Sequence, residues 1–179
     1  MIVLVHGVPE TAAYWDRLRS VLDEPTTALA LPGFGCPRPD GFGATKDEYA
    51  DWVAAQLEGF DEPVDLVGHD WGAGLTYRIA TTRPELLRSW AADVATIVHP
   101  DQVWHDFARV WQTPGEGEAF IEAQLATPVE DQLPTFEEMG LPRDAAEEMI
   151  RGLDVTMGGC ILALYRSATP NTYATWGPE

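Results

Sequence analysis

The segment 64–72 reads VDLVGHDWG, in which an apolar run ends in a Gly-x-Asp-x-Gly pattern. We predict a strand up to Val67, a sharp turn centred on Asp70 and a helix after it. Gly68 and Gly72 leave room for the chain to reverse direction, and the turn forces Asp70 into a strained backbone conformation. Such a turn lifts the Asp70 carboxylate above the strand ends, where a substrate can reach it.

A carboxylate in this position can attack carbon and form a covalent alkyl ester. That chemistry opens epoxides or displaces halide, and it suits the cleavage of peptide or lipid esters less well. The alternative is that Asp70 is only a turn residue, since Gly-x-Asp turns are common. The flanking strand and helix favour the nucleophile.

A second loop is placed to assist Asp70. Residues 6–9 (HGVP) follow the apolar run Ile2–His6, just as the aspartate turn follows the run Val64–Val67. In a doubly wound sheet the helices after two such strands leave on opposite faces and open a crevice at the carboxyl ends of the strands. We therefore expect the backbone N–H groups of Val8 and Trp71 to converge on the oxyanion that forms when water attacks the ester.

The elements that position these loops alternate between strand and helix, which predicts an α/β fold with a doubly wound, mostly parallel sheet. Residues 99–179 contain four helical patches interrupted by Pro and no convincing strand. We therefore predict a core over residues 1–98 and a helical cap over residues 99–179, laid on the strand ends. The predicted strands are Ile2–His6, Thr26–Leu31, Val64–Val67 and Ser89–Val94, and the predicted core helices cover residues 11–22, 45–60 (opened by a capping box of Thr45 and Glu48) and 71–82.

Composition limits the partners of the chain. Its 179 residues are 45% hydrophobic, enough for one globular domain with a core, and 11 basic against 29 acidic residues give a net charge of −18. So acidic a surface makes nucleic acids and anionic membranes poor partners. Cys36 and Cys160 lack metal-binding spacing, so we expect reduced thiols, a cytoplasmic location and no metal or cofactor. No apolar run approaches the roughly 20 residues of a membrane span.

The segments HGVPET, LPGFG and GHDWGAG resemble the α/β-hydrolase superfamily, in particular its epoxide hydrolase and haloalkane dehalogenase branches. The resemblance covers residues 1 to about 95 well and the cap loosely. It implies that Asp70 attacks a small, largely apolar substrate, with the Val8 and Trp71 amides holding the oxyanion.

The two branches differ in how they stabilise the leaving group. Epoxide hydrolases donate protons to the ring oxygen from two cap tyrosines. Residues 164–166 (LYR) resemble the segment that carries one of them, so Tyr165 is a candidate proton donor, whereas the other position holds Phe107. Epoxide hydrolysis is our first hypothesis.

Haloalkane dehalogenases hold halide with the indole of the Trp after the nucleophile and with an Asn or a second Trp. Trp71 fits the first role, Val8 stands in place of the Asn, and Trp104 or Trp111 could supply the second indole. Asp93, at the end of the fourth predicted strand, matches the catalytic acid of one dehalogenase group. Dehalogenation is therefore the alternative, and in either case we expect Trp104, Phe107 and Trp111 to line the apolar substrate pocket or to pack around it.

The resemblance implies a further histidine, beyond the cap and after two more strands, that activates water. The chain reaches Glu179 before such strands. Of its four histidines, His6 is expected in the oxyanion loop and His69 beside Asp70 but turned away from it. His99 and His105 are expected at the start of the cap. We expect that the natural protein is longer. The alternatives are a short protein that forms a homodimer through the open edge of the fourth strand, or a ligand-binding pseudoenzyme without turnover.

Overall fold

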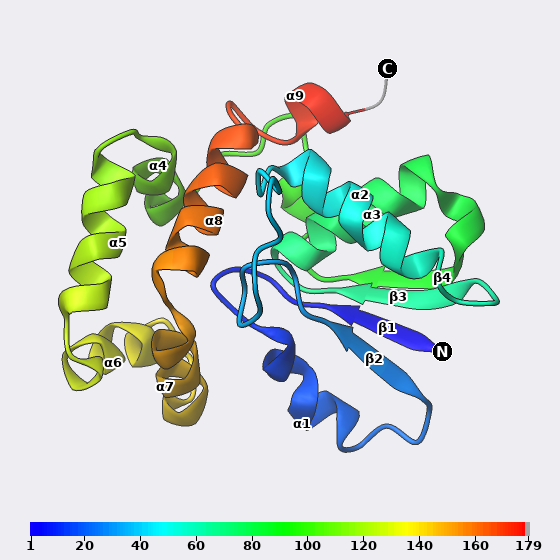
Figure 1. The fold of residues 1–179 in the computed structure, drawn as a ribbon, viewed down its shortest axis with the longest axis horizontal. Helices are drawn as coiled ribbons and strands as arrows, with labels where there is room; N and C mark the ends of the chain where they lie inside the picture. The colour runs from blue at the N-terminus through cyan, green and yellow to red at the C-terminus, as the bar shows by residue number, and fades with distance from the viewer. Residues whose placement is uncertain (178–179) are drawn as a thin grey trace.

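A four-stranded parallel sheet lies at the centre of the core. The computed structural model describes residues 1–177, apart from the side chains of residues 95 and 96. All three neighbouring strand pairs are parallel, in the order β2-β1-β3-β4, which confirms the predicted fold class (Figure 1). The strands are β1 (Ile2–Val5), β2 (Thr26–Leu29), β3 (Val64–Gly68) and β4 (Leu87–Ala92), with ends one or two residues from those predicted.

The helices after β1 and β3 lie on opposite faces of the sheet. The chain leaves β1 through η1 (Ala12–Trp15) and α1 (Asp16–Arg19), which Figure 1 shows on one face, and leaves β3 through α3 (Trp71–Thr82) on the other face. The helix α2 (Lys46–Leu57) packs beside α3. Because β1 and β3 are adjacent, the loops that follow them meet at one edge of the sheet.

The helix α2 forms where its cap signal predicts it. Glu48 N–H donates to Thr45 Oγ1 at 3.3 Å, and Thr45 N–H donates to Glu48 Oε2 at 3.1 Å, so the capping box is present. Tyr49, Val53 and Leu57 face the core and are buried. The helix ends at Leu57 instead of Phe60.

The predicted helix over residues 11–22 is wrong in length. Only the two short turns of η1 and α1 form, and Val21 is 75% exposed. The helix stops at Arg19, and Pro25 restricts only the residue before it, which leads the chain into β2. Trp15 is the residue of this segment that reaches the core.

The cap contains more helices than the four predicted patches, and residues 99–177 contain no strand. Pro128 and Pro142 stand at helix N-caps instead of interrupting helices, so each separates two helices that the sequence pattern merges. The helices of this region are α4 (Asp106–Gln112), α5 (Glu116–Ala126), α6 (Val129–Glu138), α7 (Arg143–Gly152), α8 (Val155–Ser167) and α9 (Tyr173–Trp176).

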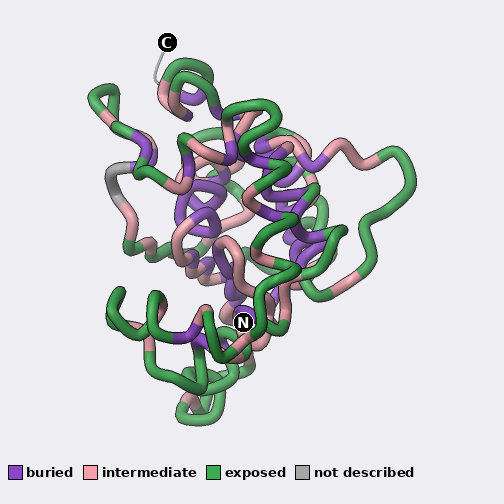
Figure 2. The backbone as a smooth tube through the Cα atoms, turned by 90° about the vertical axis from the view of Figure 1, so that its left-hand side faces the viewer, coloured by how far each residue is buried: buried purple, intermediate pink, exposed green. Residues whose placement is uncertain are grey.

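One hydrophobic core joins the sheet to the cap through α8. Ile161, Leu164 and Tyr165 on α8 belong to the same buried cluster as Val5 and Leu66 of the sheet. Figure 2 shows these buried segments gathered in the interior. The hairpin of α6 and α7 has a small separate core of Leu133, Ala146 and Ile150.

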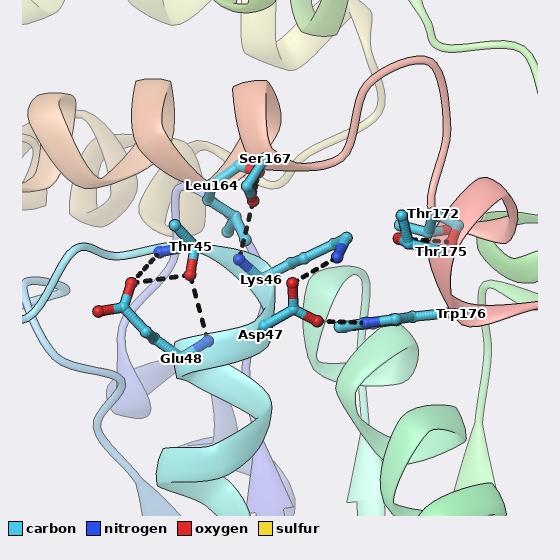
Figure 3. Close-up of polar contacts among 9 residues, drawn as sticks. All are labelled: Thr45, Lys46, Asp47, Glu48, Leu164, Ser167, Thr172, Thr175 and Trp176. Carbon is cyan, nitrogen blue, oxygen red and sulfur yellow. Dashed lines mark hydrogen bonds and ion pairs between the residues drawn. The ribbon is translucent and has the colours of Figure 1, made fainter.

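Polar contacts tie the end of the cap region to the start of α2 (Figure 3). Lys46 N–H donates to Ser167 Oγ at 2.8 Å, and the Trp176 indole N–H donates to Asp47 Oδ1 at 2.7 Å. The Lys46 ammonium pairs with Asp47 and lies 4.9 Å from the Trp176 ring centroid. The helix α9 therefore lies on the core, although it belongs to the stretch predicted as cap.

The strand β4 forms one edge of the described sheet. It pairs with β3 on one side, and no strand of residues 1–177 pairs with its other side. Trp90 is 48% exposed, even though the ring of Tyr77 packs against it. Within the described chain, no helix has the length and apolar character needed to cross a membrane.

The capping box predicts a measurable contribution to stability. Thr45→Ala removes the side-chain acceptor for the Glu48 N–H and should lower the free energy of unfolding in urea by about 1 kcal/mol. Thr45→Ser keeps the hydroxyl and should retain most of this stability. Equal losses in both variants would contradict a role for the cap.

Candidate active site

The turn between β3 and α3 has the predicted strained geometry. Asp70 has φ 50° and ψ −120°, in a region that L-residues rarely adopt. A Cβ on Gly68 would lie 2.1 Å from the Gly72 carbonyl oxygen, and a Cβ on Gly72 would lie 2.1 Å from the Val5 carbonyl oxygen. Both positions therefore require glycine, and α3 begins at Trp71 as predicted.

The loop after β1 places a backbone donor on the Asp70 carboxylate. Val8 N–H donates to Asp70 Oδ1 at 2.9 Å, so the two predicted loops face each other. Gly7 permits this approach, because a Cβ there would lie 2.3 Å from the Asp70 Cβ. Burial raises the pKa of Asp70 to about 6, although hydrogen bonds from the Val8 and Trp71 backbone N–H groups act in the opposite direction.

The ring of His69 points to two other carboxylates. Its Nε2 lies 3.3 Å from Glu10 Oε1, and its Nδ1 contacts Asp93 Oδ2. The ring stacks on Tyr14 with centroids 4.6 Å apart. The hydrogen bond to Glu10 and then that to Asp93 raise the pKa of His69 to about 9, against the effect of burial. His69 is therefore protonated at neutral pH and is a poor candidate for a general base.

Asp93 supports the turn that carries Asp70. While Asp93 Oδ2 contacts His69, its Oδ1 accepts a hydrogen bond from the Asp70 backbone N–H at 3.3 Å. Both of its oxygens thus have partners in the turn, and its side chain is 54% exposed. The role of Asp93 as the acid that orients a catalytic histidine stays a prediction.

The other three histidines also have structural partners. His6 is buried, with Nδ1 2.8 Å from the Gly7 carbonyl oxygen and Nε2 accepting from the Leu31 N–H. His105 Nδ1 accepts from the Ala108 N–H and caps α4, and His99 Nδ1 accepts from the Asp101 N–H. None of the four forms a hydrogen bond with the Asp70 carboxylate within the described residues.

Four of the predicted site residues come together in one aromatic cluster. The ring of Tyr165 on α8 lies 5.4 Å from Trp71, 5.3 Å from Trp104 and 4.8 Å from Trp111, measured between centroids. Burial, and then the charge of Asp70, raises the pKa of Tyr165 well above its usual value. The hydroxyl of Tyr165 therefore stays protonated. Phe107 is half-buried and packs on the outer side of this cluster against Trp111.

The indole N–H groups of this cluster lack partners. Nε1 of Trp71, of Trp104 and of Trp111 is buried without a hydrogen-bond acceptor in the described part of the protein. An unsatisfied buried donor costs about 1–3 kcal/mol, so these N–H groups are the candidate donors to a ligand in this cluster.

The aromatic side chains of this cluster pack closely in this conformation. Trp71, Trp104 and Tyr165 are each at most 8% exposed and pack directly on one another. A hollow of about 670 Å³ at residues 35–38, Asp154 and Thr156, and another of about 310 Å³ at residues 60–63, Met1 and Arg88, do not include Asp70. The described residues form no cluster of His, Cys, Asp and Glu suited to a metal ion.

The raised pKa of Asp70 predicts that this carboxylate destabilises the fold at neutral pH. Its pKa rises from an ordinary 3.8 to about 6, so the folded state binds this proton more tightly than the unfolded state. Stability is then lost as the pH rises from about 4 through about 6. Asp70→Asn should raise the free energy of unfolding near pH 7.5 by up to about 3 kcal/mol, and by much less near pH 4.

The matched control for this measurement is Asp51→Asn at an exposed position of α2. An Asp70→Asn effect no larger than that of the control at both pH values would contradict the burial of the carboxylate.

The turn predicts opposite effects of alanine at two helical glycines. At Gly72 the new Cβ meets backbone, so Gly72→Ala should cost at least about 2 kcal/mol in thermal or urea unfolding. At Gly159 on α8 a Cβ meets open space, and Gly159→Ala should stabilise by about 0.5–1 kcal/mol. Tolerance of alanine at Gly72 would contradict the tight packing of the turn.

Comparison with known proteins identifies the family of this chain. A model of the Alpha/beta hydrolase family matches residues 2–178. The AB hydrolase superfamily protein YfhM of Bacillus subtilis is 31% identical over 106 residues, which are 56% of this chain and 36% of that protein. A haloalkane dehalogenase of Bradyrhizobium diazoefficiens is 27% identical over 150 residues, which are 68% of this chain and 45% of that protein.

A solved structure shares the fold. A Pseudomonas aeruginosa protein assigned as an epoxide hydrolase superposes with a TM-score of 0.73 at 22% identity, covering 94% of this chain and 63% of that one. The chain thus spans less than half the length of the two curated relatives. Because the family model matches nearly all of its residues, the chain belongs to the alpha/beta hydrolase family.

Proposed function

We propose that Asp70 attacks an electrophilic carbon of a small, largely apolar substrate and forms an alkyl ester, most favourably by opening an epoxide. The observation that carries this proposal is the hydrogen bond of 2.9 Å from the Val8 N–H to Asp70 Oδ1 at the tip of a strained turn. It holds one carboxylate oxygen where the ester carbonyl oxygen would later lie.

Epoxide opening needs an acid beside the nucleophile. As an Asp70 oxygen bonds to the ring carbon, the ring C–O bond breaks and its electron pair stays on oxygen, which takes the proton of the Tyr165 hydroxyl. The high pKa of Tyr165 keeps that proton in place until the oxyanion forms. Phe107 cannot donate a second proton, so Tyr165 carries this role alone or with an indole N–H.

Dehalogenation is the second candidate, favoured by the unpartnered indoles. Trp71 and Trp104 stack with centroids 5.8 Å apart, and both buried N–H groups lack acceptors among the described residues. When Asp70 displaces halide, the halide leaves with the bonding electron pair and can accept hydrogen bonds from these indoles. The haloalkane dehalogenase among the relatives supports this alternative.

The described residues offer no evident base for hydrolysis of the ester. Hydrolysis requires water activated by a base, and all four histidines are engaged elsewhere. We therefore propose that this chain forms the ester faster than it hydrolyses it, so the alkyl enzyme accumulates.

Intact-mass spectrometry tests the reaction. Incubation with styrene oxide should add the mass of one substrate molecule, whereas a bromoalkane should add its alkyl group and release bromide. Asp70→Asn should show neither adduct, and the wild-type adduct should approach one per chain. A wild-type chain without any adduct, or with sustained release of diol or bromide and no adduct, would contradict the proposal.

Substitutions can distinguish the donor that serves the epoxide oxygen from the donor that serves halide. Tyr165→Phe should slow adduct formation from styrene oxide by about a hundredfold, because the acid is lost, and should affect the bromoalkane much less. Trp104→Phe should slow the bromoalkane reaction preferentially. Equal effects of both variants on both substrates would argue that these side chains only pack.

A further inference from the structure

We propose that Glu10, His69 and Asp93 form a clamp that holds the Val8 N–H on the Asp70 carboxylate, and that all three are positioning residues for the attack. This inference rests on the proposed function of Asp70. It assigns a role to Glu10 and His69, which take no part in the proposed reaction steps. The clamp consists of these three side chains in the loop after β1, the turn after β3 and the end of β4.

Glu10 links the oxyanion loop to the turn. Its Oε2 accepts from the Gly7 N–H at 2.9 Å, and its Oε1 lies 3.3 Å from His69 Nε2. The Glu10 N–H in turn donates to the Gly7 carbonyl oxygen at 3.3 Å. Gly7 and Glu10 thus close a tight turn around Val8, which fixes the direction of the Val8 N–H.

Asp93 anchors the other side of the ring. It binds His69 Nδ1 and also accepts from the Asp70 backbone N–H at 3.3 Å. The His69 backbone N–H donates to the Val5 carbonyl oxygen at 3.1 Å, so the backbone that carries the ring is held on β1 as well. Contacts therefore run from Gly7, the neighbour of Val8, through Glu10, His69 and Asp93 to Asp70, and the Val8–Asp70 hydrogen bond closes the circuit.

Charge and stacking keep this circuit together. A protonated His69 lies between the carboxylates of Glu10 and Asp93, which are its polar contacts on the loop after β1 and on the end of β4. Tyr14 covers one face of the ring, with planes 8° apart, and Asp70 is the remaining acidic neighbour. The His69 side chain is 26% exposed, so solvent screens the clamp only in part.

Without the clamp, the loop after β1 would be held to the turn chiefly by the Val8 hydrogen bond itself. A single bond between two half-buried loops is a weak restraint on direction. The three side chains add further connections between the same two loops, so they hold the donor in place before a substrate arrives.

NMR spectroscopy of the Val8 amide tests the clamp directly. In ¹⁵N-labelled protein, Glu10→Ala should shift the Val8 amide resonance toward that of a non-bonded N–H and speed its hydrogen exchange at least about tenfold. Glu10→Gln keeps one acceptor oxygen and replaces the other with an NH2 donor, so it should retain part of the protection. Glu24→Ala, at an exposed position before β2, is the matched control.

Two further readings accompany that shift. The His69 ring should titrate near pH 9 in the wild type and nearer its ordinary 6.5 in Glu10→Ala. Formation of the Asp70 ester from styrene oxide should slow at least about tenfold in Glu10→Ala, as expected when an oxyanion donor is misplaced, and should recover in part in Glu10→Gln.

The outcomes separate the clamp from the proposed function. A displaced Val8 amide in Glu10→Ala, with no ester even in the wild type, would support the clamp and overturn the nucleophile. A wild-type ester with an unchanged Val8 amide and unchanged rate in Glu10→Ala would overturn the clamp and keep the nucleophile. General loss of dispersed amide signals in Glu10→Ala, with Glu10→Gln identical to wild type in all three readings, would also overturn it, because Glu10 would then support only the fold.

Discussion

The site depends on one hydrogen bond between two loops that lie 62 residues apart, from the Val8 N–H to Asp70 Oδ1. The bond exists because β1 and β3 are adjacent and parallel, so that both loops emerge at the same edge of the sheet. It also requires glycine at positions 7, 68 and 72, where a side chain would meet Asp70 or the backbone. The position of the Asp70 carboxylate therefore depends directly on the architecture of the sheet.

Two features of the site lower the stability of the fold, as is common at functional sites. Burial raises the pKa of Asp70 to about 6, and three indole donors of the aromatic cluster lack acceptors in the described residues. A core selected for stability alone would avoid both. The buried core offsets this cost, and Ile161, Leu164 and Tyr165 of α8 belong to it together with residues of the sheet.

Local signals made much of this site predictable. The Gly-x-Asp-x-Gly turn, the capping box at Thr45 and the start of α3 at Trp71 depend on neighbouring residues, and all three are present. The members of the aromatic cluster can be named from the sequence, but their mutual packing cannot, because it depends on how α4 and α8 meet. The contact of His69 with Glu10 and Asp93 joins three distant segments, and no spacing in the sequence reports it. The cap helices were undercounted since proline at an N-cap and proline in a loop look alike in sequence.

The central claim is that the Asp70 carboxylate bonds to carbon. Peptide-level mass spectrometry of the protein after exposure to styrene oxide tests it most directly, because fragmentation locates the added group on one residue. The account predicts that the group sits on Asp70 and is released by mild alkali, as an ester is. An added group on a histidine, a cysteine or another carboxylate, with an unmodified Asp70, would contradict it.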